Sequence, residues 1–522
     1  MLKHVVMPNL ALFGELVRCI TSLGRTEGRP LVEIAPSAGH QTPKRKRTAT
    51  DPPVKPSGNG MCEGGGMSER VIVIGADAAG MSAASQALRT AERTGRSLDV
   101  VAVDRGHWTS YSACGIPYWI AGDTDGPDAL VARTPEEHRA NGIDVRTFTE
   151  AESIDLDRRA VRVVDRASGR VESLGFDHLV LATGAVPVRP DIPGADAGGV
   201  LGVQTLDDGA DVLRWLEKRS PRRAVVVGGG YIGVEMAEAM VRRGLSVTVV
   251  DRSAEPMSTL DPDLGRKVHH AMEAMGIDVA TDTEVRGFEV GSDGAVRAVV
   301  TSAGDVPADV VVLGTGVRAA TDLAAAAGLP LGERAALRVD DRLRVLGHDG
   351  VWAAGDCVES YHRVLRRPVH VPLGTHANKQ GRVLGTNLGG GEARFPGVVG
   401  TAITKVCDLE IARTGLREID AERAGIDYVA TTTDSTTRAG YFPGAEEITI
   451  KVLAERHTGR LVGAQVVGRD GSAKRIDVLA MAVWNELTVD ELAMVDLSYA
   501  PPFAPVWDPV LIAARRAADA LT

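Results

Sequence analysis

The chain has 522 residues, of which 44% are hydrophobic and 25% charged, so it has ample material for a globular core. Its length suggests about three or four domains, and its formal net charge of -10 argues against a nucleic-acid partner, which would require a basic face. The sequence has no run of ~18 apolar residues, so we expect no membrane-spanning helix.

The five cysteines are dispersed along the chain, and none belongs to a CxxC pair. This pattern suggests neither a zinc site nor a dithiol redox motif. An odd, dispersed set of cysteines fits a reducing cytoplasm better than a secreted fold held by disulfides. We therefore expect a cytoplasmic protein that holds no metal.

The first 66 residues differ in composition from the rest of the chain. They contain the basic run KRKR at 44–47 and stretches rich in proline and glycine, which are typical of linkers and disordered segments. KRKR could be a targeting signal or an acid-binding patch, but a solvated charge run is the more frequent explanation. Because a clear strand pattern follows Met67, we interpret residues 1–66 as a disordered extension or as sequence upstream of the true start.

Two stretches of the chain follow the same order of strand, glycine loop, helix, strand and acid. In the first, the strand pattern Val71–Gly75 leads into a helix pattern over Ala78–Arg93 and a second strand over Asp99–Asp104. In the second, Ala224–Gly230 leads into a helix and then into the strand pattern Leu245–Asp251. This order predicts an α/β protein with two Rossmann-like dinucleotide-binding domains.

The second glycine loop has a complete GxGxxG arrangement, with Gly228, Gly230 and Gly233 between strand and helix. Glycines permit the tight turn and a close approach to a pyrophosphate, while the helix N-terminus supplies amide donors. Asp251 ends the next strand, 23 residues after Gly228, where it can bind the adenosine ribose hydroxyls. The acid favours NADH because it repels a 2′-phosphate, but the adjacent Arg252 leaves NADPH open.

The first glycine loop is degenerate. Gly75 and Gly80 stand at its ends, but Asp77 occupies the place of the middle glycine. An acid beside a pyrophosphate is unfavourable unless its side chain points away. Because Asp104 ends the next strand as Asp251 does in the second unit, we still expect this loop to bind the adenosine half of FAD.

Two later turns favour the FAD interpretation. Ala182-Thr183-Gly184 follows the apolar run HLVL, and Gly355-Asp356 follows the run VWAA, so both are turns at strand ends. A plain turn would explain either one alone. Both resemble the short motifs of two-dinucleotide flavin reductases, and this resemblance implies that Asp356 binds the ribityl or pyrophosphate part of the flavin.

Cys114 lies in SYSACGIPYWIAG, ten residues after Asp104. If Asp104 holds the adenosine of FAD, the following segment can run along the flavin. We expect a helix that starts near Cys114 to lower the pKa of its thiol, so that the thiolate can attack a disulfide. An isolated cysteine is more often buried and inert, which is the role we expect for Cys357. With no second cysteine nearby, Cys114 must cycle through a mixed disulfide, a persulfide or a sulfenic acid.

These motifs, in this order, resemble the pyridine nucleotide-disulfide oxidoreductases, and specifically their single-cysteine branch of coenzyme A-disulfide reductases, persulfide reductases, NADH oxidases and NADH peroxidases. The resemblance runs from about Val71 to the C-terminus and implies a C-terminal α+β dimerisation domain after the two Rossmann-like domains. The expected division is a disordered extension at 1–66, an FAD-binding domain at 67–186 and 318–390, an NAD(P)H-binding domain at 187–317, and a dimerisation domain at 391–522.

The resemblance also implies roles for residues outside the glycine loops. Tyr441 in GYFPG and Tyr499 in SYAPPF match two tyrosines that reach the partner's active site in coenzyme A-disulfide reductases, which implies a homodimer. Gln86, Arg89 and Ser110 match positions that contact coenzyme A. A turn tyrosine and an exposed helix arginine are the ordinary structural alternatives.

Other positions select among members of the branch. Tyr231 matches the residue that gates the nicotinamide side of the flavin. NADH oxidases and peroxidases carry a histidine in the first glycine loop, where this chain has Ala78, which disfavours oxygen or peroxide as the acceptor. Tyr111 and Ala113 give SYSAC rather than the SFANC of many relatives, so the preferred disulfide stays open.

Together these features predict an oxidoreductase that uses FAD and NADH or NADPH. Its expected substrate is coenzyme A disulfide or a related low-molecular-weight disulfide or persulfide, reduced through Cys114. A water-forming NADH oxidase is the alternative within enzymes. In a different class, the chain could be a flavin-bearing redox sensor or interaction protein that uses residues 1–66 as a docking tail.

Overall fold

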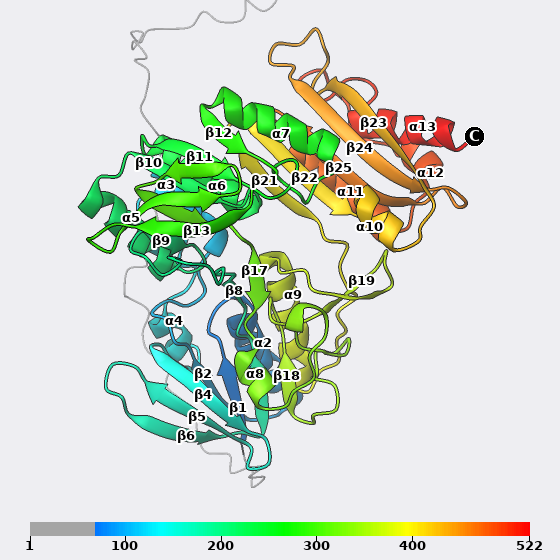
Figure 1. The fold of residues 1–522 in the computed structure, drawn as a ribbon. Coiled ribbons are helices and arrows are strands. Elements are labelled where there is room, and N and C mark those ends of the chain that lie inside the picture. Colours follow the sequence, from blue (N-terminus) through cyan, green and yellow to red (C-terminus); the bar gives the residue numbers. More distant parts are fainter. Residues whose placement is uncertain (1–67) are drawn as a thin grey trace, which may run out of the picture. The chain divides into compact units, whose positions relative to one another are not determined.

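A computed structural model describes residues 68–522, so the extension predicted at 1–66 lies outside the described residues. Three five-stranded sheets organise the described part of the chain (Figure 1). The first sheet takes four strands from the N-terminal part and its last strand from residues 351–353. The chain thus leaves this sheet, forms the second sheet and returns to the first before it enters the third.

The first sheet is parallel throughout, in the order β18-β7-β1-β2-β3. Its central strands are runs of buried Val, Ile and Ala, as expected for parallel strands covered on both faces. Helix α2 (Ala78–Thr94) connects β1 to β2 at the predicted position. The strands are β1 (Glu69–Ile74), β2 (Leu98–Val103), β3 (Ile143–Arg146), β7 (His178–Leu181) and β18 (Val351–Ala353).

Helix α9 (Gly374–Leu388) packs closely against α2 along a stripe of glycines (Figure 1). An added Cβ at Gly385 would lie 2.3 Å from the carbonyl oxygen of Ala83 on α2. Gly381 and Gly389, one turn to either side, approach α2 backbone atoms almost as closely. Any side chain on this stripe would therefore force the two helices apart.

The second sheet is also parallel, in the order β12-β11-β10-β16-β9. Helix α6 (Tyr231–Arg242) connects β10 to β11 and repeats the arrangement of β1, α2 and β2. Helices α5 (Leu206–Arg219) and α7 (Pro262–Ala274) belong to the same part of the chain. The strands are β9 (Val200–Gly202), β10 (Arg223–Val227), β11 (Ser246–Val250), β12 (Ile277–Ala280) and β16 (Val310–Leu313).

The third sheet is antiparallel, in the order β21-β22-β25-β24-β23. Helices α11 (Ile476–Trp484) and α13 (Pro509–Leu521) share a buried apolar cluster with its strands. The predicted α/β fold with two Rossmann-like units and a C-terminal α+β domain is therefore confirmed, whereas the domain boundaries stay predictions. The strands are β21 (Ala402–Val406), β22 (Leu409–Gly415), β23 (Tyr428–Thr436), β24 (Glu447–Glu455) and β25 (Leu461–Gly468).

Smaller elements connect these sheets. The chain leaves the first sheet through β8 and returns from the second sheet through β17, and these two strands pair in antiparallel fashion. The remaining strands are β4 (Thr149–Asp155), β5 (Ala160–Asp165), β6 (Val171–Gly175), β8 (Ala185–Pro187), β13 (Val285–Val290), β14 (Val296–Thr301), β15 (Gly304–Pro307), β17 (Val317–Ala319), β19 (Ser360–His362) and β20 (Arg367–Val369). The shorter helices are α3 (Ile116–Ala121), α4 (Pro135–Ala140), α8 (Asp322–Ala326), α10 (Glu418–Arg423) and α12 (Val489–Ala493), and the 3₁₀ turns are η1 (Ala113–Gly115), η2 (Pro127–Leu130), η3 (Glu333–Ala335) and η4 (Ala473–Arg475).

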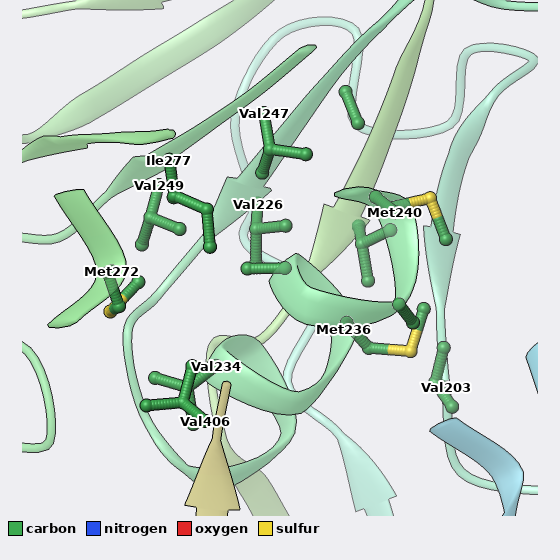
Figure 2. Packing of buried hydrophobic residues seen from close by; sticks show 14 of the residues in the cluster. Val203, Val226, Val234, Met236, Met240, Val247, Val249, Met272, Ile277 and Val406 are labelled. Carbon is green, nitrogen blue, oxygen red and sulfur yellow. The ribbon is translucent and has the colours of Figure 1, made fainter. Parts of the chain in front are cut away.

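One hydrophobic core contains residues from each of the three parts of the chain that form the sheets. Around the second sheet it contains buried residues such as Val226 and Met236, and Val406 of β21 joins the same cluster (Figure 2). Ile116 and Trp119 of α3 belong to it as well. The helix that directly follows Cys114 is therefore anchored in the core of the second unit, which fixes the cysteine where the parts of the chain meet.

Candidate active site

The first glycine loop joins β1 to α2 and is closed on one side by the turn Ala182-Thr183-Gly184. Gly75 has φ +105°, in the left-handed region, and an added Cβ would lie 2.1 Å from the carbonyl oxygen of Ala182. Only glycine fits this position. Gly80 lies in the first turn of α2 and packs directly against Gly75. The loop and the predicted turn thus pack against each other at the carboxyl end of the first sheet.

The acids at the ends of β2 and β11 hold the two glycine loops in the same way. Asp104 accepts a hydrogen bond on Oδ2 from the backbone N of Ala76 at 2.8 Å. Asp251 accepts one on Oδ2 from the backbone N of Gly229 at 2.5 Å and another on Oδ1 from Ser253 at 2.7 Å. Both carboxylates therefore lie beside a helix N-terminus at a sheet's carboxyl edge, where doubly wound folds bind nucleotides.

The second glycine loop leaves room above its middle glycine. Gly228 has φ +100°, and an added Cβ there would lie 2.4 Å from the carbonyl oxygen of Gly314. A Cβ at Gly230 would meet no atom within 4 Å, so the N-terminus of α6 is open to a pyrophosphate. Gly233 completes the first turn of α6. Tyr231 begins the helix, and its buried hydroxyl has no hydrogen-bond partner among residues 68–522.

Asp77, the residue that makes the first loop degenerate, directs its carboxylate to the cysteine loop. Its Oδ1 accepts a hydrogen bond from the backbone N of Tyr111 at 3.1 Å. Burial raises the pKa of Asp77 to about 7, and the carboxylates of Asp104 and Asp356 add to this rise. The acid thus connects the first glycine loop to the segment that carries Cys114.

Gly355 and Asp356 follow β18 and are held by side chains from the region of α9. The backbone N of Gly355 donates to Oε1 of Gln380 at 2.7 Å, and Gln380 itself is 1% exposed. Nε2 of His370 lies 2.7 Å from the carbonyl oxygen of Asp356. Burial raises the pKa of the Asp356 carboxyl, and His370 partly offsets this. The predicted turn therefore meets the first glycine loop from the α9 side.

The cysteine loop, residues 110–115, is held from two sides. The backbone N of Ser110 donates to Ala76 O at 3.3 Å, on the side of the first glycine loop. On the other side, Ala132 N donates to Ser110 O at 2.8 Å and Ser112 N donates to Leu130 O at 2.8 Å. Cys114 follows in the turn η1 and is exposed. The thiol is therefore presented on a loop whose backbone is fixed.

The prediction that a helix dipole lowers the pKa of Cys114 is wrong. Although Cys114 is exposed as a residue, partial desolvation of its sulfur raises the pKa of the thiol, and the carboxylates of Glu235 and Asp356 raise it further. Helix α3 begins only at Ile116 and has 6 residues, so its dipole is weak and lies beyond the thiol. The two acids come from other parts of the chain, which is why a local pattern could not reveal them.

Neither of the other described cysteines resembles Cys114. Cys357 is fully buried, and its sulfur contacts the carbonyl oxygens of Leu181 and Ala354 at 3.5 and 3.4 Å, so it is the buried turn cysteine that was predicted. Cys407 contacts the sulfur of Met275 at 2.8 Å, and burial raises its thiol pKa to about 12. All three described cysteines are free thiols, and Cys19 and Cys62 lie outside the described residues.

Comparison with known protein families decides what these loops belong to. Residues 69–381 match the family model for pyridine nucleotide-disulphide oxidoreductases, and residues 401–509 match the dimerisation domain of the same family. The chain belongs to the pyridine nucleotide-disulphide oxidoreductase family. It is therefore an FAD- and NAD(P)H-dependent oxidoreductase, as predicted, and it carries the family's domain for homodimer formation.

Relatives in this family differ in the reaction they are named for. Over 462 residues the chain is 38% identical to the NAD(P)H coenzyme A polysulfide/persulfide reductase of Pyrococcus horikoshii, with 87% of this chain and 99% of the relative covered. It is 35% identical to the NADH oxidase of Methanocaldococcus jannaschii, with 87% and 99% covered. The crystal structure of reduced Bacillus anthracis CoADR-RHD matches with a TM-score of 0.83 and 31% identity, covering 87% of this chain and 81% of that one.

Gln86 and Arg89, predicted to contact coenzyme A, lie on successive turns of α2. Arg89 donates from Nη2 to Oε1 of Gln86 at 2.9 Å. Arg89 is exposed, and no carboxylate within residues 68–522 pairs with it. Its guanidinium is therefore free to bind a phosphate.

Tyr441 and Tyr499 are brought together on the surface of the dimerisation domain. The two residues are 78% and 46% exposed, and the neighbouring Tyr441 raises the pKa of Tyr499. Other exposed apolar residues on this domain are Phe503, Val506 and Trp507. Such an exposed apolar surface is typical of an interface.

Three residues around the family site were missed in the sequence. Glu235 of α6 accepts a hydrogen bond on Oε1 from Thr404 at 2.5 Å, and burial raises the pKa of its carboxyl. Gln380 and His138 are both 1% exposed and hold the loops at Gly355 and Ser110. Their partners are distant in sequence, and a local signal existed only for Glu235, an acid inside the apolar helix pattern of α6.

Two further observations concern the described residues as a whole. Across residues 68–522, no three side chains among His, Cys, Asp and Glu are grouped so that they could hold a metal ion. No helix in that part of the chain has the length and apolar character needed to cross a membrane.

Proposed function

We propose that the chain reduces coenzyme A disulfide or a coenzyme A persulfide with electrons from NAD(P)H, through Cys114 as its single redox cysteine. The observation that carries this proposal is the fixed loop 110–115, which presents an exposed thiol next to the first glycine loop. The relative from Pyrococcus horikoshii, a coenzyme A polysulfide/persulfide reductase, supports the substrate class. The free state of the described cysteines supports a reducing, cytoplasmic setting.

The two glycine loops fit the family's cofactors. In the first unit Asp104 would hold the adenosine ribose of FAD, the N-terminus of α2 the diphosphate, and Asp356 the ribityl part. In the second unit Asp251 and the open space above Gly230 would receive the adenosine half of NAD(P)H. FAD bound there would supply two-electron transfer between NAD(P)H and the disulfide.

The thiol chemistry belongs to Cys114. Its thiolate attacks one sulfur of coenzyme A disulfide, forms a mixed disulfide and releases the other coenzyme A, which takes up a proton. Two electrons then cleave the mixed disulfide, free the second coenzyme A and restore the Cys114 thiolate. Overall, one NAD(P)H, one proton and one disulfide give NAD(P)⁺ and two thiols. Protonation of Glu235, whose pKa is raised, removes one of the charges that oppose the thiolate.

The substrate's thiol arms would be held by residues of both subunits. Gln86, Arg89 and Ser110 are proposed to bind coenzyme A in the same chain as Cys114. Tyr441 and Tyr499 are proposed to reach the partner's site, orient the disulfide and donate a proton to the leaving thiolate. Their exposure and their mutual contact support a role across a subunit interface.

Replacement of Cys114 by serine tests the proposal. The Cys114→Ser variant should retain its yellow flavin but lose coenzyme A disulfide-dependent NAD(P)H oxidation by at least about a hundredfold, because a hydroxyl cannot form the mixed disulfide. The Cys407→Ser variant is the matched control and should keep wild-type turnover. Mass spectrometry of the wild type should find a coenzyme A adduct on Cys114. Retained turnover in Cys114→Ser would reject the proposal.

A water-forming NADH oxidase is the second candidate, favoured by the relative from Methanocaldococcus jannaschii. Ala78 in the first glycine loop speaks against it, since oxidases of the branch were expected to carry a histidine there. Oxygen uptake by the wild type without any thiol substrate separates the two functions. Uptake as fast as disulfide-dependent NAD(P)H oxidation, together with an added oxygen rather than coenzyme A on Cys114, would favour the oxidase.

A further inference from the structure

A buried histidine supports the cysteine loop from the side opposite the first glycine loop. His138 on α4 is 1% exposed, and its Nε2 lies 2.9 Å from Oγ of Ser110. Helix α4 is fixed by a capping box between Thr134 and Glu137 and by a hydrogen bond from Nε of Arg139 to the carbonyl oxygen of Val145 at 2.9 Å. The imidazole is therefore held in place by its own helix.

Ser110 has an unusual backbone at this contact. Its φ is +47°, which a residue other than glycine rarely adopts. Hydrogen bonds to Ala76 O and from Ala132 N hold the residue in this conformation. Strained backbone of this kind persists where the surroundings determine it and is concentrated at functional sites. The hydroxyl is thus fixed four residues before Cys114.

The hydrogen bonds of His138 decide which partner donates. Burial lowers the pKa of His138, and the nearby Arg133 lowers it further, so the imidazole is neutral near pH 7 and carries one N–H. Nδ1 is buried and has no partner among residues 68–522. A hydrogen on Nδ1 would be a buried donor without an acceptor, which is costly, whereas a hydrogen on Nε2 is satisfied by Ser110. Nε2–H therefore donates, and the Ser110 hydroxyl accepts.

We propose that His138 is a positioning residue that orients the Ser110 hydroxyl as a hydrogen-bond donor to a carbonyl oxygen on the thiol arm of the substrate bound at Cys114. Because Ser110 accepts from Nε2–H, its own O–H must point to another acceptor. This inference rests on the proposed function, since it assigns Ser110 to that substrate. The substrate group it selects is an acceptor such as an amide carbonyl.

The test compares His138 variants of the FAD-loaded enzyme in steady-state assays with coenzyme A disulfide and NADH. His138→Phe removes the donor, so the Ser110 hydroxyl can turn and the KM for the disulfide should rise about tenfold. The kcat and the KM for NADH should stay unchanged, because the lost contact is made equally in the ground state and the transition state. His138→Gln keeps an N–H donor near the position of Nε2 and should return the KM to within about threefold of the wild type.

A second pair of variants keeps the inference falsifiable if His138→Phe folds poorly. Ser110→Ala should raise the KM for the disulfide as much as His138→Phe does, and the double variant should be no worse than either single one, because both remove the same contact. Additive effects would overturn the inference. An unchanged KM for the disulfide in His138→Phe with full flavin content would also overturn it. Equal increases in the KM for NADH and the KM for the disulfide would do the same.

The outcomes also separate this inference from the proposed function. Suppose that Cys114→Ser loses the turnover of coenzyme A disulfide, but the His138 and Ser110 variants keep wild-type KM values. This result would overturn the role of His138 alone. A wild type that does not turn over coenzyme A disulfide would overturn both.

Discussion

At the residue scale, the active site is unusual for the number of carboxyl groups it gathers at the first glycine loop. Burial and the carboxylates of Asp104 and Asp356 raise the pKa of Asp77, which stands where a glycine is expected. Because Asp77 hydrogen-bonds to Tyr111 of the cysteine loop, it supports that loop at an electrostatic cost. Below pH ~7 its protonated form predominates in the folded chain.

This arrangement predicts a specific dependence of stability on pH. The folded pKa of about 7 lies above the value of 3.8 for a free aspartate, so the folded chain binds the proton more tightly. The contribution of Asp77 to the free energy of unfolding is full below pH ~4, is lost as the pH rises to ~7 and changes little above that. Asp77→Asn keeps an acceptor for Tyr111 without the charge. It should raise the melting temperature of the holoenzyme by roughly 2–4 °C at pH 8 and by less than about half as much at pH 5. A melting curve that shifts equally at both pH values would contradict this origin.

At the scale of elements, the sequence predicts the two glycine loops well because their signals are local. Each strand, loop, helix and acid occupies some thirty consecutive residues, and the backbone of Gly75 and Gly228 requires the residue that is there. The packing of α9 on α2 was not predicted, because the glycines of α9 are recognisable as a contact surface only when the partner helix is known. The same reason hid the contact between Ser110 and His138, which lie 28 residues apart.

The contact between α2 and α9 makes a prediction that runs against helix propensity. Gly385→Ala should gain about 1 kcal/mol from propensity in the middle of α9. The added Cβ would lie 2.3 Å from a backbone oxygen of α2, which cannot move without its helix, and such overpacking costs about 1–3 kcal/mol or more. We expect the steric term to win, so the variant should melt earlier and release FAD faster than the wild type. Gly175→Ala, in an exposed strand where the Cβ meets only one atom at 4.0 Å, is the control and should change neither.

At the scale of the whole molecule, the site is assembled from parts that no short stretch of sequence contains. Ile116 and Trp119 lie on α3, shortly after Cys114, and pack into the core of the second unit. Val406 of the third sheet enters the same core (Figure 2). Glu235 belongs to the second unit and accepts a hydrogen bond from Thr404 of the third sheet. Together with partial desolvation, the carboxylate of Glu235 raises the pKa of the Cys114 thiol. The thiol pKa was predicted wrongly for this reason, since its determinants depend on tertiary packing.

A buried ion cluster joins the second unit to the third sheet and leads to the last prediction. Lys451 of β24 is 5% exposed, and its Nζ lies 3.2 Å from Asp261, 2.9 Å from Asp263 and 3.1 Å from Glu418. Burial opposes the charge of Lys451, but the three carboxylates outweigh it and raise its pKa. The lysine is thus the cation that makes burial of Asp261 tolerable.

Removal of this cation should therefore destabilise the connection more than the loss of one ordinary ion pair. Lys451→Met preserves the volume of the side chain but removes the cation from the buried Asp261. The cost should be about 3 kcal/mol or less, because Gln465 still donates to Asp261 and the other two carboxylates are partly exposed. Lys474→Met removes an exposed pair with Asp477, where at most about 1 kcal/mol is at stake, and is the control. We expect Lys451→Met to lower the melting temperature and to speed limited proteolysis between the second and third sheets, while Lys474→Met behaves as the wild type. An equal melting temperature for Lys451→Met and the wild type would contradict this role, because three carboxylates that lie 2.9–3.2 Å from the lysine nitrogen would have lost their cation without effect.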